Sequence, residues 1–196
     1  MYYHYQLMRI KKTFVLILLL FFLASCSSPV SSDFVPKTFP VDMSGYQGIR
    51  STEHCFEGTT VSELIRCIDE KGNGIFIISA TWCQHCQLFM RHLNKIAMEE
   101  GVTIYYISAD YPEDNPYPIG DEEVDLIREY FYPYLATDPD THEKEVYTPH
   151  LFSIVNGRVL DSQLSGKETG DEEKDGENIE RVYRKILERY LKKTEG

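Results

Sequence analysis

Two of the five cysteines, Cys83 and Cys86, stand close together in the stretch TWCQHC, with two residues between them. One cysteine of such a pair can attack a substrate disulfide as a thiolate, and the other can resolve the mixed disulfide that results. The same spacing is found in half of a zinc site and in passive structural crosslinks. The remaining cysteines and the elements around the pair distinguish these three chemistries.

The other cysteines argue against a metal site. Structural zinc is held by four ligands, commonly from two such pairs, and this chain has one pair. Cys55 and Cys67 have eleven residues between them, which is not the spacing of a metal-binding pair. They are expected either to form a structural disulfide between a strand and the first helix, worth about 3 kcal/mol, or to remain buried free thiols. No metal and no other cofactor is expected.

The pair is predicted to lie at the junction of a strand and a helix. Residues 75–78 form a continuous apolar run, as expected of a central strand buried on both faces. After Cys83, apolar residues recur at helical spacing until Gly101, which ends the helix. Cys83 then lies near a helix N-terminus, where unpaired amides and the helix dipole favour a thiolate. Cys86 lies three residues further along, within reach of the first sulfur.

The order of the other elements predicts an α/β fold with a mixed sheet and helices on both faces. A right-handed crossover makes the strands at 75–78 and 102–107 parallel. Asn156-Gly157 is a strong two-residue hairpin turn, so the strands on either side of it are antiparallel. The remaining elements are a helix at 61–68, a helix at 124–134 that Pro133 bends or ends, strands at 151–155 and 158–163, a polar loop at 165–176 and a last helix at 179–191.

Two segments resemble the signatures of the thioredoxin superfamily. The segment ISATWCQHCQLFMRHLNKIA is similar to its active-site strand, Trp-Cys-x-x-Cys motif and helix. The segment YTPHLFSIVNGRVLDSQLSG is similar to its second signature, in which a proline precedes a strand, Asn-Gly, another strand and a glycine. The resemblance covers about residues 50–194. It implies a thioredoxin fold, with an insertion at about 111–146 before the strand that follows a cis-proline.

The resemblance also implies roles for individual residues. Cys83 and Cys86 would be the catalytic dithiol. Pro149 would be the cis-proline that packs against the active-site disulfide, and Thr148 would offer its backbone to an extended substrate peptide. The residues that support the active site would be Trp82, Gln84, His85, Thr148 and Pro149.

Several features depart from the pattern of the superfamily. Many relatives keep a buried proton-accepting acid six residues before the first cysteine, and Ile77 stands there, so proton transfer must use water or another group. His85 is similar to a residue that stabilises the thiolate in oxidants of the DsbA kind, or else it is a solvated surface residue. His150 either aids the thiolate or is a structural histidine. The insertion is either a substrate-facing surface or a solvated decoration.

The first 26 residues predict export. Three basic residues, Arg9, Lys11 and Lys12, precede an apolar run at 14–23. Ten residues of helix rise only about 15 Å, half of a bilayer core, so a secretory signal peptide is predicted rather than a transmembrane anchor. Leu23-Ala24-Ser25-Cys26 closely resembles a bacterial lipobox, the site at which a peptidase cuts before a lipidated cysteine. The other reading is a secreted protein in which Cys26 is incidental.

These features divide the chain into three expected parts. Residues 1–25 would be a lipoprotein signal peptide, and residues 26–45 the lipidated Cys26 and a flexible tether rich in Ser and Pro. Residues 46–196 would be the thioredoxin-like domain. Lipidation would anchor the protein to the extracytoplasmic face of the cell membrane, a compartment in which disulfides persist.

The charge of the chain limits its partners. The formal net charge is −11, and the first 25 residues carry three basic side chains and no acidic one, so the remainder carries −14. Such an acidic surface argues against nucleic acid and against close association with anionic lipid headgroups.

The sequence therefore predicts an extracytoplasmic thiol–disulfide oxidoreductase that acts on the thiols or disulfides of exported proteins or peptides. His85 favours an oxidant. A reductant for exported thiols, of the cytochrome c maturation or bacteriocin-accessory type, is the alternative within this class. Either direction needs a membrane redox partner. A binding lipoprotein with a permanently closed disulfide is the alternative outside it, because fold alone does not establish function. Trp82 beside a helix-terminal Cys83 favours the enzyme, because a structural disulfide needs neither.

Overall fold

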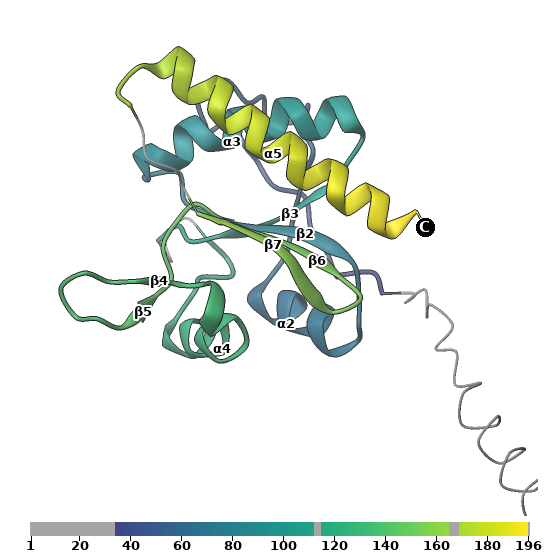
Figure 1. The fold of residues 1–196 in the computed structure, drawn as a ribbon, viewed down its shortest axis with the longest axis vertical. Coiled ribbons are helices and arrows are strands. Elements are labelled where there is room, and N and C mark those ends of the chain that lie inside the picture. Colours follow the sequence, from purple (N-terminus) through teal and green to yellow (C-terminus); the bar gives the residue numbers. More distant parts are fainter. Residues whose placement is uncertain (1–33, 112–114, 165–168, 196) are drawn as a thin grey trace, which may run out of the picture. The chain divides into compact units, whose positions relative to one another are not determined.

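The computed structural model describes residues 34–111, 115–164 and 169–195. The predicted signal peptide at 1–25 and the predicted lipidation site Cys26 lie outside the described residues. The described chain begins with an extended segment, continues through the sheet and its helices, and ends in a long helix (Figure 1).

A mixed five-stranded sheet lies at the centre of the domain. Its strands, in spatial order, are β1 (Phe56–Gly58), β3 (Ile104–Ser108), β2 (Gly74–Ser79), β6 (His150–Val155) and β7 (Arg158–Leu164). The first three are parallel to one another, β6 is antiparallel to β2, and β7 is antiparallel to β6. This order and these directions are those of the thioredoxin fold, which confirms the fold predicted from the sequence.

Helices cover both faces of the sheet (Figure 1). Helices α3 (Gln84–Glu100) and α5 (Glu172–Thr194) pack on one face, where they form the larger hydrophobic cluster with the strands. Helices α2 (Val61–Asp69) and α4 (Asp121–Phe131) pack on the other face in a second cluster. Cys83 and Cys86 belong to the first cluster. The redox pair thus lies on the face of the sheet that α3 and α5 cover.

The central strand β2 explains why both faces are covered. Each of its six residues is buried, as the continuous apolar run predicts. Because side chains alternate along a strand, Ile75 and Ile77 contact the cluster of α3 and α5, whereas Phe76 and Ile78 contact that of α2 and α4. At the end of β2 the chain turns into α3, which places Cys83 at the junction.

The turn between β6 and β7 is the predicted two-residue hairpin. Asn156 and Gly157 both have positive φ angles, of 51° and 67°, as such a tight turn requires. A Cβ atom on Gly157 would lie 2.3 Å from the carbonyl oxygen of Ile68 at the end of α2. Glycine therefore lets this turn lie directly against the backbone of α2.

The last helix begins earlier than the sequence predicted. The loop was expected to extend to Gly176, but Asp171 caps α5 by accepting a hydrogen bond from the backbone N–H of Lys174. Gly176 lies inside the helix, and a Cβ there would lie 2.6 Å from the ring of His92 on α3. Gly176, predicted to be the last residue of the loop, instead permits the close approach of α5 to α3.

The segment predicted to be a flexible tether is part of the domain from residue 34 onward. Phe39 forms a bridge to Gly58 of β1 with two backbone hydrogen bonds of 2.9 Å, and Met43 is 1% exposed. The predicted domain boundary at residue 46 was therefore wrong. The abundance of Ser and Pro indicated a tether, but the aromatic and apolar residues between them supply side chains that the core buries.

The insertion at 111–146 is partly built into the second cluster. It forms α4, the 3-10 turn η1 (Tyr132–Tyr134) that contains Pro133, and a small hairpin of β4 (Ala136–Thr137) and β5 (Lys144–Glu145). Ile127 and Phe131 of α4 are completely buried against the face of the sheet that α2 also covers. The insertion is therefore more than a solvated decoration.

Candidate active site

Cys83 occupies the N-cap of α3, as the sequence predicted. Its sulfur accepts a hydrogen bond from the backbone N–H of Cys86 at 3.3 Å, in the position where a side-chain oxygen caps most helices. The backbone N–H of Cys83 donates to the carbonyl oxygen of Ala80 at the end of β2. The strand, the turn and the helix together hold the sulfur at the positive end of the helix dipole.

The two sulfurs differ in their access to solvent. Cys83 is 7% exposed and Cys86 is 0% exposed, so a substrate can reach only the first. Both are free thiols in the structure. Burial raises the pKa of Cys86 to about 11, because an apolar surrounding disfavours the thiolate. This difference suits Cys83 to attack first and Cys86 to resolve.

The second signature lies beside the first, as the resemblance implied. The Thr148–Pro149 peptide bond is cis. The Cys83 thiol donates to the carbonyl oxygen of Thr148 at 3.5 Å, across 65 positions of the sequence. Pro149 is buried, whereas Thr148 remains half exposed. The nucleophilic sulfur therefore lies against a main-chain segment that an extended peptide could also contact.

The predicted supporting residues form the rim of the site. Trp82, Gln84 and His85 are all exposed next to the cysteines. Trp82 is 56% exposed and stacks on Tyr111, at the start of the insertion, with ring centroids 5.8 Å apart. These two rings place an aromatic surface beside Cys83.

Gln87 is a functional residue that the sequence did not reveal. Its amide nitrogen donates to the carbonyl oxygens of Thr81 and Gly45, and its amide oxygen accepts from the backbone N–H of Gln47. The Gln87 side chain of α3 thus links residues 45–47 to the active-site turn through hydrogen bonds. Nothing in the local sequence distinguishes this glutamine, because its partners lie up to 42 positions away.

Asp110 was not predicted either, and it fixes the turn from the other side. Its Oδ1 atom accepts hydrogen bonds from the backbone N–H and the hydroxyl of Thr81, both at 2.7 Å. Its Oδ2 atom accepts from the hydroxyl of Ser108 at the end of β3. The carboxylate therefore joins the ends of two neighbouring parallel strands next to the cysteines.

The disulfide considered for Cys55 and Cys67 is not formed. Both are free thiols. Cys67 lies in the cluster on the α2 side of the sheet, whereas Cys55 packs against the cluster of α3 and α5, and its backbone N–H donates to Asn94 of α3. The sheet lies between the two sulfurs, so the alternative of separate thiols is the one that the structure adopts.

His150 is a structural histidine rather than part of the redox site. It is completely buried on the same face of the sheet as Phe152, with the two rings 4.0 Å apart, and its Nε2 atom lies 2.8 Å from the Ser162 hydroxyl. The cysteines belong to the opposite face. Burial lowers the pKa of His150 to about 4, so the ring is neutral in the folded chain.

We expect His150 to make the fold sensitive to acid. The unfolded chain protonates this ring near pH 6.5 and the folded chain only near pH 4, so the unfolded state binds more protons between those values. The free energy of unfolding therefore falls as the pH decreases through this interval. His150→Gln should remove about 2 kcal/mol of the loss between pH 6.5 and pH 5. Urea titrations of both proteins test this, and parallel pH dependences would contradict it.

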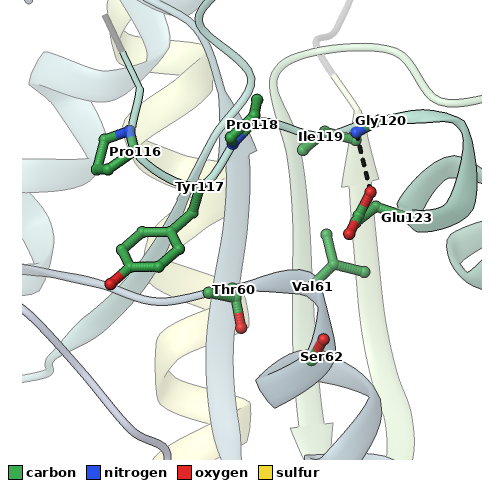
Figure 2. Close-up of a pocket in the computed structure, with 9 residues that line it drawn as sticks. All are labelled: Thr60, Val61, Ser62, Pro116, Tyr117, Pro118, Ile119, Gly120 and Glu123. Carbon is green, nitrogen blue, oxygen red and sulfur yellow. Dashed lines mark hydrogen bonds between the residues drawn. The ribbon is translucent and has the colours of Figure 1, made fainter. Parts of the chain in front are cut away.

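A cleft of about 500 Å³ lies between the start of α2 and the insertion (Figure 2). Thr60, Val61 and Ser62 form one side of it, and residues 116–120 form the other. The backbone N–H of Gly120 donates to the carboxylate of Glu123, which closes the first turn of α4 (Figure 2). Neither cysteine of the redox pair lines this cleft.

The described part of the chain contains neither a membrane span nor a metal cluster. Within residues 34–111, 115–164 and 169–195, no helix is both long and apolar enough to cross a membrane. Over the same residues, no group of three or more His, Cys, Asp or Glu side chains is arranged to hold a metal ion.

Comparison with known proteins gives matches among solved structures and none among family models or curated proteins. No model of a protein family matches the chain, and neither does any curated protein. Among solved structures, it is similar to a protein to which an oxidoreductase activity and a thioredoxin fold are attributed, with 14% identity, a TM-score of 0.39, and coverage of 61% of this chain and 93% of the other. It is also similar to oxidised thioredoxin O2 from Arabidopsis thaliana, with 16% identity, a TM-score of 0.37, and coverage of 66% and 95%. Sequence identities and TM-scores this low support no argument about function, so the function is proposed from the residues of this chain.

Proposed function

We propose that the chain is a thiol–disulfide oxidoreductase. In the reducing direction, the Cys83 thiolate attacks a substrate disulfide, which forms a mixed disulfide and releases one substrate sulfur as a thiolate. Cys86 loses its proton and attacks the Cys83 sulfur, which forms the Cys83–Cys86 disulfide and releases the second substrate thiolate. Two electrons pass from the protein to the substrate, and both substrate sulfurs take up protons. The oxidising direction is the reverse of these steps.

One observation carries this proposal. The less buried sulfur, that of Cys83, lies between the backbone N–H of Cys86 and the carbonyl oxygen of Thr148, beside the exposed ring of Trp82. This arrangement leaves the sulfur next to an exposed aromatic ring and to main chain that an extended substrate could pair with. A purely structural disulfide requires neither feature.

We further propose that the enzyme acts outside the cytoplasm on exported proteins or peptides, and that it does so as an oxidant. The lipobox-like Leu23-Ala24-Ser25-Cys26 supports a lipid anchor on the outer face of the cell membrane. His85 supports the oxidising direction, since a cationic or donating side chain beside the thiolates stabilises the reduced form. A membrane redox partner that accepts electrons would then reoxidise the dithiol.

The reduction potential of the pair tests the direction. The mature chain with Cys26→Ser would be equilibrated in glutathione buffers, and the thiols counted after alkylation. A potential near about −120 mV indicates an oxidant, and one near about −270 mV indicates a reductant for exported thiols. A pair that resists reduction well below that range would support a binding lipoprotein with a closed disulfide, and would overturn the enzymatic proposal.

His85→Pro should lower the reduction potential by some tens of millivolts, where about 30 mV corresponds to 1.4 kcal/mol. The substitution removes a side chain that stabilises the thiolate but should leave α3 intact. Residue 85 lies in the first turn of the helix, where a proline forfeits no intrahelical hydrogen bond. Gln84→Ala, at the neighbouring exposed position, is the control. Equal potentials in all three proteins would mean that His85 has no influence on the dithiol.

A further inference from the structure

The resolving step of the proposed function requires Cys86 to lose a proton, and its surroundings limit where that proton can go. Cys86 is 0% exposed, so no water reaches its sulfur directly from the surface. Ile77, completely buried, occupies the position where many proteins of similar sequence pattern keep a proton-accepting acid. Another route for the proton must therefore exist on this face of the sheet.

A hydrogen-bonding group lies two residues further along the same strand. Side chains two apart on a strand point to the same face, so Ser79 faces the α3 side as Ile77 does. Its interaction with the Cys86 thiol lowers the pKa of Cys86 and so partly opposes the effect of burial. Ser79 is itself completely buried.

Hydroxyl groups continue from Ser79 toward the surface. The hydroxyl of Tyr46 donates to Ser79 Oγ at 2.9 Å and lies 3.0 Å from the hydroxyl of Tyr106. The Tyr106 hydroxyl lies 3.4 Å from Oδ2 of Asp110, to which it can donate. We call Ser79, Tyr46, Tyr106 and Asp110 the hydroxyl chain. Its three hydroxyl groups lead from the buried sulfur of Cys86 to the carboxylate of Asp110.

The two tyrosines are suited to pass a proton without holding a charge. Burial raises the pKa of Tyr46 far above its ordinary value and that of Tyr106 to about 12, so both remain neutral. A neutral hydroxyl can accept one proton and donate another. Tyr46 donates toward Ser79, which leaves the hydrogen of Ser79 free to point at the Cys86 sulfur. The reversed orientation carries a proton outward.

The outer end of the hydroxyl chain meets solvent. Asp110 is half buried, and together with Tyr106 and Ser108 it lines a cleft of about 240 Å³. Tyr46 is held at the inner end because Gln87 binds the backbone on both sides of it, at Gly45 and Gln47. The segment before β1 is thus fixed by the same helix that carries the cysteines.

On the basis of the proposed function, we propose that the hydroxyl chain is the proton path of Cys86. During resolution, the Cys86 proton moves to Ser79 as the sulfur attacks Cys83, each hydroxyl passes on its own proton, and Asp110 receives one and releases it to the water in the cleft. The Cys86–Cys83 bond forms and the bond from Cys83 to the substrate breaks. In the oxidising direction the protons move inward.

Single-turnover oxidation tests the path. Reduced protein with Cys26→Ser is mixed with excess oxidised glutathione, quenched with acid and alkylated, and the mixed and intramolecular disulfides are separated by mass. Tyr46→Phe should slow the conversion of the first to the second by about tenfold or more near pH 7, as expected for the loss of proton-transfer catalysis. The deficit should shrink toward pH 10, where Cys86, with a pKa of about 11, increasingly ionises without help.

Two further variants separate a proton path from a packing defect. Tyr106→Phe removes the hydroxyl between Tyr46 and Asp110, and it serves as the test variant if Tyr46→Phe does not fold. The double variant should be no slower than either single one, because a path already broken cannot be broken again. Tyr183→Phe is the matched control: it removes a hydroxyl from another buried tyrosine of the same cluster that also faces Cys86. Tyr46, Tyr183 and Cys83 are titratable groups that interact with Cys86.

The outcomes are distinct. A pH-dependent deficit in Tyr46→Phe or Tyr106→Phe, with Tyr183→Phe at the wild-type rate, supports the path. Equal rates in the wild type and both chain variants, or a deficit that is the same at every pH, overturn it and leave the oxidoreductase intact. A wild-type protein that forms no Cys83–Cys86 disulfide overturns the proposed function and the path together.

Discussion

Cys86→Ser should accumulate covalent complexes between Cys83 and its substrates, whereas Cys83→Ser should form none and lose exchange activity completely. The reason is the difference in access: Cys83 is 7% exposed and its sulfur accepts a hydrogen bond from the backbone N–H of Cys86, whereas Cys86 is fully buried. Removing the resolving thiol leaves the mixed disulfide without an internal attacker. The complexes can be counted on non-reducing gels after incubation with a disulfide-bonded test protein.

Cys67→Ala is the control for this experiment. Its thiol is equally buried but lies on the opposite face of the sheet, so its removal should change stability slightly and exchange activity not at all. If Cys86→Ser accumulates no more complex than Cys67→Ala, or if Cys83→Ser keeps the wild-type activity, the assignment of attacking and resolving thiols is wrong.

Gly157→Ala should destabilise the domain by roughly 3 kcal/mol or more, which is the combined cost of a positive φ and of forced overpacking. Its φ is 67°, and its new Cβ would lie 2.3 Å from Ile68 O and 2.8 Å from Lys71 Cα. Both are backbone atoms, so the end of α2 or the β6–β7 hairpin must move. Urea unfolding of the two proteins measures the difference in the free energy of unfolding.

Gly101→Ala provides a matched comparison. Gly101 has nearly the same φ, 66°, but nothing outside its own chain neighbours lies within 4 Å of the place that a Cβ atom would take. Only the conformational cost of about 1 kcal/mol therefore applies there. The difference between the two variants isolates the contact between the hairpin and α2. Equal losses of stability would mean that this contact relaxes freely.

The core of the active site could be predicted from the sequence because its signals are local. An apolar run defined β2, the helical spacing after Cys83 defined α3, and Asn156-Gly157 defined the hairpin turn. The two signatures, each a continuous segment, indicated that Cys83 and Pro149 would meet. Local patterns of this kind need no knowledge of distant partners.

The surroundings of the active site could not be predicted, because they consist of contacts between distant residues. Tyr46 reaches Ser79 across 33 positions, and Gln47 reaches Gln87 across 40. Strand β1 has only three residues, too few for a periodic pattern. Composition was misleading for the predicted tether, because Ser and Pro at 27–40 suggested a flexible segment although Phe39 pairs with Gly58 and Met43 is buried.

The bridge between Phe39 and Gly58 protects one edge of the sheet. An uncovered edge strand invites other chains to pair with it and aggregate. Strand β1 is an edge strand of the sheet, and the backbone of Phe39 forms hydrogen bonds with both the N–H and the carbonyl group of Gly58. A side chain at Gly58 would strike the Phe39 ring, at 2.3 Å. Because Gly58 has no side chain, Phe39 can pair with it, and another chain cannot extend the sheet at Gly58.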